Sequence, residues 1–135
     1  MKRVRLGRVG HFGLSVRDPK TSAEWWRERF DLKTMFEMEG VIGLSNDAIT
    51  IVFHTGVPHP GTFQHMSFHC EDMETLRASL ELLREAGVDV EDPGDEIGPE
   101  APGSPHLALW FHDPDGYRWE LSVQTERRSS AGNPV

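Results

Sequence analysis

The sequence HFGLSVRD at residues 11–18 returns in altered form as HMSFHCED at residues 65–72. The two segments align at a constant offset of 54 residues (65 − 11), and each begins with histidine and ends with aspartate. Outward and inward residues alternate in both segments, which is the pattern of a half-buried strand. A constant offset of this kind indicates two copies of one structural unit in the chain.

A helix is expected directly after each of these strands. In the first copy Asp18 is a good N-cap and Pro19 suits the first helical position, and the helix should run to about Phe30. In the second copy Asp72 is the cap and Gly87 ends the helix. The buried stripe of that second helix is formed by Leu76, Leu80, Leu83 and Ala86.

Three short strands should follow each helix. We expect them at residues 32–38, 41–44 and 49–54 in the first copy, and at residues 88–91, 107–111 and 117–123 in the second. The predicted fold class is therefore α+β, with two tandem βαβββ modules in a single domain of residues 1–135. The modules should cover about residues 7–54 and 65–124, with a linker at 55–64, a long acidic loop at 93–105 and a polar tail at 125–135. Neither module can bury a sheet face alone, so we expect the two sheets to curl around a shared cavity.

Composition excludes several classes of partner. The 135 residues carry a net charge of −8, and the sequence pI is near 5.3, which disfavours binding to nucleic acid and to anionic membrane surfaces. No apolar run approaches the roughly 20 residues that a membrane-spanning helix needs. Cys70 is the only cysteine, so a disulfide within the chain is impossible and a reducing cytoplasm is the expected setting.

Three side chains have the composition of a metal centre. His11 and His65 begin the two equivalent strands, so a pseudo-twofold arrangement would bring them together. Glu120 lies inside the closing strand YRWEL (117–121), where a carboxylate is costly unless it is paired, hydrogen-bonded or bound to a metal. Two imidazoles and one carboxylate are the ligands of non-haem Fe(II) oxygenases and of some catalytic zinc sites.

These segments together resemble the vicinal-oxygen-chelate superfamily, which includes glyoxalase I, extradiol ring-cleavage dioxygenases, and fosfomycin- and bleomycin-resistance proteins. The opening strand at 11–18, its partner at 65–68 and the closing signature FHDPDG (111–116) followed by WEL (119–121) carry the resemblance, over about residues 7–124. The resemblance implies a divalent metal held by His11, His65 and Glu120, and a homodimer.

Departures from the family pattern narrow the activity. Ile51 aligns with the fourth metal ligand of glyoxalase I, and His54 falls on the wrong parity to replace it. The acidic segment 91–100 has no Lys or Arg, although fosfomycin enzymes need basic residues there. Trp110 stands where extradiol dioxygenases usually carry a tyrosine. Bleomycin-resistance proteins lack the metal ligands, so an intact triad argues against pure sequestration.

Further candidates for the site lie on the strands of the second module. His69 shares strand parity with His65, and His106 opens a strand after the long loop, so either could transfer protons. The alternative for both is an ordinary hydrogen-bonded or solvated histidine. Trp110 and Trp119 are the candidates for lining a substrate pocket, with core packing as the default interpretation for both.

Three functions remain open on these grounds. The first, which we favour, is a dioxygenase-like oxidoreductase in which Fe²⁺ or Mn²⁺ chelates two vicinal oxygens of a small substrate. The second is a lyase, isomerase or epimerase of glyoxalase type that uses Zn²⁺, Ni²⁺, Co²⁺ or Mn²⁺. The third is a non-catalytic module that binds a small aromatic molecule, as a drug-sequestering protein does.

Overall fold

The first of two compact units in the chain, Met1–His59, is built around a four-stranded sheet. The computed structural model describes residues 2–91, 97–99, 103 and 106–124, so the predicted tail at 125–135 and most of the loop at 93–105 lie outside the described residues. The second unit is Pro60–Val135. The boundary between the units falls within residues 55–64, the segment predicted as a linker.

The first unit has the element order βαβββ. Its elements are β1 (Phe12–Val16), α1 (Pro19–Arg29), β2 (Lys33–Met38), β3 (Val41–Ser45) and β4 (Thr50–Thr55). The strand order across the sheet is β1-β4-β3-β2, in which β1 runs parallel to β4 and the other pairs are antiparallel.

Local sequence explains where α1 begins and which face it buries. The carboxylate of Asp18 accepts hydrogen bonds from the backbone N–H of Lys20 at 3.1 Å and from Thr21 Oγ1 at 2.9 Å, as an N-cap does. The helix ends at Arg29, one residue before the predicted end. Trp26 is 1% exposed, and its ring lies 6.4 Å from that of Phe53 on β4, so α1 covers this face of the sheet.

The second unit repeats this arrangement. It contains a short 3₁₀ turn η1 (Pro60–Thr62), β5 (Met66–His69), α2 (Met73–Glu85), β6 (Asp89–Val90), β7 (Gly98–Pro99), β8 (His106–His112) and β9 (Arg118–Gln124). The order β5-β9-β8-β6, with β5 parallel to β9, matches the order of the first unit. The predicted α+β fold with two similar modules is therefore confirmed. The short strand β7, which pairs with β8, was not predicted.

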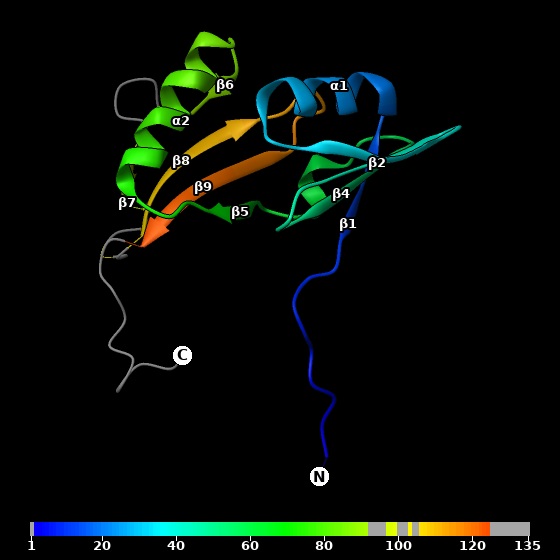
Figure 1. Ribbon diagram of the computed structural model, residues 1–135, viewed down its shortest axis with the longest axis horizontal. Helices are drawn as coiled ribbons and strands as arrows, with labels where there is room; N and C mark the ends of the chain where they lie inside the picture. Colours follow the sequence, from blue (N-terminus) through cyan, green and yellow to red (C-terminus); the bar gives the residue numbers. More distant parts are fainter. Residues whose placement is uncertain (1, 92–96, 100–102, 104–105, 125–135) are drawn as a thin grey trace. The chain divides into compact units, whose positions relative to one another are not determined.

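Helix α2 covers one face of the second sheet, where it lies along β8 and β9 (Figure 1). Asp72 Oδ1 accepts a hydrogen bond from Thr75 N at 2.8 Å, and Gly87 follows the helix with a φ of 71°, as predicted. The buried side chains of α2 are Leu76, Leu80 and Leu83. Within the described part of the chain, neither helix has the length and apolar character needed to cross a membrane.

Candidate metal centre

The two faces of the second sheet differ in chemistry. On β9 and its neighbours, Glu120 lies in register with Ser67 of β5 on one side and Trp110 of β8 on the other, and Ser122 lies in register with His69. Partners in register project from the same face. We call this the polar face, defined by Ser67, His69, Trp110, Arg118, Glu120 and Ser122. The opposite face carries the buried side chains of Leu109, Phe111, Trp119 and Leu121.

A buried carboxylate and an imidazole meet on the polar face. The Glu120 side chain is 0% exposed, whereas that of His65, which directly precedes β5, is 33% exposed. Their Nε2 and Oε1 atoms lie 3.7 Å apart. Two ligand atoms that bind the same metal ion, each at about 2.1 Å, can be at most about 4.2 Å apart. The separation therefore fits two ligands of a single divalent ion, and both groups are ordinary ligands for such an ion.

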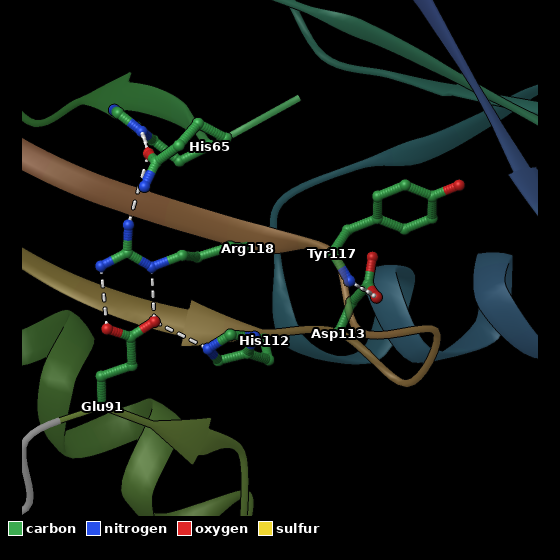
Figure 2. A network of polar contacts seen from close by, with 7 residues as sticks. His65, Glu91, His112, Asp113, Tyr117 and Arg118 are labelled. Carbon is green, nitrogen blue, oxygen red and sulfur yellow. Dashed lines mark hydrogen bonds and ion pairs between the residues drawn. The ribbon is translucent and has the colours of Figure 1, made fainter. Parts of the chain in front are cut away.

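The second ring nitrogen of His65 belongs to a polar network that crosses the sheet. His65 Nδ1 contacts Gln64 Oε1, which also accepts a hydrogen bond from Arg118 Nη1 at 3.5 Å. Arg118 donates to both carboxylate oxygens of Glu91, from Nε at 2.6 Å and from Nη2 at 2.9 Å. His112 Nε2 lies 2.7 Å from Glu91 Oε2. Figure 2 shows Arg118 between Glu91 and His65.

Electrostatics and ring contacts hold this network in place. Hydrogen bonds from Arg118 and His112 lower the pKa of Glu91 below its usual value, and the bonds to Glu91 raise the pKa of Arg118. The Arg118 guanidinium also lies over the Trp110 ring at 3.9 Å, and the Trp110 ring meets His65 edge-on at a centroid distance of 4.8 Å. The pair of Arg118 and Glu91 is therefore charged at neutral pH, and it lies against the Trp110 ring, which itself contacts His65.

Asp113 fixes the turn that leads into β9. Its Oδ1 accepts hydrogen bonds from the backbone N–H of Asp115 at 2.9 Å and from that of Tyr117 at 3.0 Å, and Figure 2 shows the second of these. Its Oδ2 accepts a hydrogen bond from Trp119 Nε1 at 3.1 Å. Burial raises the pKa of Asp113 to about 6, against the opposing effect of these hydrogen bonds. The turn at residues 113–116 thus fixes the start of β9 and with it the position of Glu120 along the strand.

Two of the three predicted metal ligands are brought together. His65 and Glu120 belong to the second unit, whereas His11 precedes β1 in the first unit and is exposed. Among the described residues, no three histidine, cysteine, aspartate or glutamate side chains form a ligand cluster. The three-ligand centre and the shared cavity therefore stay predictions.

The other predicted site residues divide between the two faces. His69 is exposed on the polar face, and alternation along β8 places His106 on the same face as Trp110. Trp119 lies on the opposite face, 0% exposed, with its ring stacked on Phe68 at a centroid distance of 5.5 Å. The pocket-lining role predicted for Trp119 does not fit this position, and its alternative, core packing, does.

The strand parity assigned to β4 was wrong. Ile51 lies in register with Phe12 and is 0% exposed, whereas His54 lies in register with Ser15. Because side chains alternate, His54 shares a face with Gly13 and Ser15, and His11 lies two residues before Gly13. A Cβ built on Gly13 would lie 3.3 Å from the His54 ring, so glycine provides the space for that ring.

Sequence reasoning missed Gln64, Glu91 and Arg118. Arg118 lies two residues before Glu120 and so has the same parity, a signal that was present in the sequence. Glu91 is 27 residues away from Arg118, and their contact follows from the pairing of β6 with β8, beside which Glu91 N donates to Trp110 O at 2.9 Å.

Solved structures similar to this chain share the same fold. A glyoxalase/bleomycin resistance protein/dioxygenase from Nocardioides matches with a TM-score of 0.76 and 14% identity, over 95% of this chain and 90% of that chain. The fosfomycin resistance protein FosX from Listeria monocytogenes matches with a TM-score of 0.71 and 17% identity, over 88% and 94% of the two chains. The oxidase ChaP-H2 matches with a TM-score of 0.67 and 20% identity, over 96% and 100%.

Sequence comparison identifies the family more directly than these distant structures. No curated protein matches the sequence. The model of the Glyoxalase/Bleomycin resistance protein/Dioxygenase superfamily matches residues 8–121, which include all three predicted ligands and every strand except the end of β9. The chain therefore belongs to the Glyoxalase/Bleomycin resistance protein/Dioxygenase superfamily.

Proposed function

We propose that this chain is a divalent-metal-dependent enzyme, and specifically a dioxygenase-like oxidoreductase that acts on a small substrate with two neighbouring oxygen atoms. The observation that carries the proposal is the fully buried Glu120 carboxylate, whose Oε1 lies 3.7 Å from His65 Nε2 on the polar face. Burying a carboxylate is unfavourable unless a counter-charge compensates it. A divalent ion at this position would supply that charge.

His65 and Glu120 would hold the ion together with His11, which occupies the position in the first unit equivalent to that of His65. Fe²⁺ or Mn²⁺, when bound, would supply Lewis acidity and redox activity toward vicinal oxygens. Trp110 offers a half-buried aromatic ring beside His65, against which a flat substrate could pack. His69 and His106 on the same face are the groups that would accept and return protons.

The family and the structural neighbours agree with this proposal at a coarse level. The family name covers glyoxalases, bleomycin resistance proteins and dioxygenases, and the neighbours include both an oxidase and a fosfomycin resistance protein. Their identities of 20% and 17% support the shared fold alone. The same proposal includes a homodimer, which the family resemblance implies. It also includes a cytoplasmic location, which the lone cysteine favours.

Metal content tests the proposal. We would purify the untagged protein and measure bound metals by plasma mass spectrometry, with Glu120→Gln and His65→Ala as the test variants. Glu81→Gln, exposed on α2, and His59→Ala, exposed in the first unit, are the matched controls. We expect near-stoichiometric metal in the wild type and controls, and its loss in both test variants.

The activity assay then separates the three functions. A panel of catechols with Fe²⁺ or Mn²⁺ should support O₂ uptake by the wild type. Turnover that persists under strict anaerobiosis would favour the glyoxalase-type lyase or isomerase instead. The proposal would be contradicted, and a binding module favoured, by two results together. The protein would bind none of the five candidate ions, and its affinity for small aromatic molecules would not change when a chelator is added.

A further inference from the structure

Gln64 and Arg118 lie beside His65, and neither has a role in the proposed chemistry itself. We propose that they are positioning residues: Gln64 holds the proton of the neutral His65 ring on Nδ1, so that the Nε2 lone pair is directed toward Glu120 and the metal. This inference rests on the proposed function, because it assumes that His65 is a metal ligand.

The first step concerns the orientation of the Gln64 amide. The oxygen and nitrogen of an amide are hard to distinguish by shape, so their assignment follows from the hydrogen-bond partners. A guanidinium has only donors. The Gln64 atom 3.5 Å from Arg118 Nη1 must therefore be an acceptor, which identifies it as Oε1. Arg118 thus fixes which end of the amide faces His65.

The second step concerns the tautomer of His65. The same Gln64 Oε1 atom contacts His65 Nδ1. An amide oxygen only accepts, so Nδ1 must carry the hydrogen in this contact. The neutral ring then has its lone pair on Nε2, the atom that lies 3.7 Å from Glu120 Oε1. A metal binds the unprotonated nitrogen, so this tautomer is the one that ligation by Nε2 requires.

The third step concerns the rigidity of the anchor. Arg118 is held by two hydrogen bonds to Glu91 and by the Trp110 ring beneath its guanidinium. Planar, bidentate pairs of this kind restrict orientation more than a single charge contact does. The position of Gln64, next to β5, is therefore set from the opposite edge of the sheet, where Glu91 follows β6, through the side chain of Arg118. Arg118 and His65 make no hydrogen bond to each other in this network.

The tautomer can be measured in the metal-free protein. Long-range ¹H–¹⁵N NMR spectra at pH 8, above the usual histidine pKa, distinguish a protonated from an unprotonated nitrogen in each ring. We expect His65 to carry its hydrogen on Nδ1 in the wild type. Gln64→Leu should shift His65 toward the Nε2–H tautomer, and Gln64→Glu, which keeps an acceptor, should preserve the wild-type pattern.

Metal affinity provides the second readout, with Zn²⁺ as the probe in calorimetric titrations. Partners of a ligating histidine typically contribute 10- to 100-fold in affinity, so Gln64→Leu should raise the dissociation constant by about tenfold or more. Gln64→Glu should stay close to the wild type. Arg118→Met should weaken binding while Arg77→Met, exposed on α2, should not. Thermal unfolding of each variant controls for loss of fold.

The outcomes separate this inference from the function on which it rests. The positioning role would be overturned if His65 in the wild type carried its hydrogen on Nε2. It would also be overturned if the folded Gln64→Leu variant kept both the wild-type tautomer and the wild-type Zn²⁺ affinity. A Gln64-dependent Nδ1–H tautomer in a protein that binds no Zn²⁺ would support the orientation of the ring and overturn the proposed metal centre instead.

Discussion

Lowering the pH from 7.5 to 5 should stabilise the fold through the carboxyl group of Asp113. Burial raises its pKa to about 6 in the folded protein, compared with the ordinary aspartate value of 3.8 that we take for the unfolded chain. A raised folded pKa means that the native state binds the proton more tightly. The free energy of unfolding therefore increases as the pH falls through 6 toward 4.

The size of the effect follows from the difference between the two pKa values. The difference between a pKa of about 6 and one of 3.8 corresponds to about 3 kcal/mol between the fully ionised and the fully protonated states. About half of this, near 1.4 kcal/mol, should be recovered between pH 7.5 and pH 5. Carboxylates with lowered pKa values, such as Glu91, act in the opposite direction, but only as the pH falls below about 4.5.

Urea unfolding at several pH values would measure this effect, with Asp113→Asn as the comparison. The substitution also changes the hydrogen bond from Trp119, but that change does not depend on pH. The difference in unfolding free energy between wild type and Asp113→Asn should therefore increase by about 1.4 kcal/mol in favour of the wild type from pH 7.5 to pH 5. A difference that stays constant, or that changes in the opposite direction, would refute the raised pKa.

Three further predictions concern the two sheets. Metal-free Glu120→Gln should be at least as stable as the metal-free wild type, because it replaces a fully buried charge; a lower melting temperature of the variant would contradict this. Arg118→Lys should lower the melting temperature more than Arg77→Lys, because lysine cannot make the bidentate contact with Glu91; equal effects would argue against the pair. Gly43→Ala should destabilise the protein by about 1–3 kcal/mol in urea unfolding, because a Cβ there would lie less than 3 Å from ring atoms of Phe36; a neutral effect would show that the ring moves freely.

The repeat was readable from the sequence because local rules specify it twice. Asp18 and Asp72 are N-caps whose side chains accept hydrogen bonds from the first turn, and each follows a strand of alternating polarity. Gly87 ends α2 with a positive φ. Each of these features depends only on neighbours within a few residues, so the pattern predicted it directly.

Features that depend on strand register were harder to predict. Trp119 is adjacent to Glu120, and adjacent residues of a strand project from opposite faces, so strand alternation alone favours core packing over a place in the pocket for Trp119. The parity of β4 cannot be predicted in this way, because it follows from the pairing of Ile51 with Phe12, a long-range contact. Arg118 and Glu91 likewise meet only after β6 pairs with β8.

The most direct test of the metal centre is an anomalous-scattering map from crystals of the protein loaded with Zn²⁺, as a spectroscopically silent stand-in for the native ion. Our account predicts one strong peak within about 2.2 Å of His65 Nε2, a Glu120 carboxylate oxygen and a ring nitrogen of His11. Crystals that show no peak at Glu120, or that show Zn²⁺ only at other side chains, would contradict it.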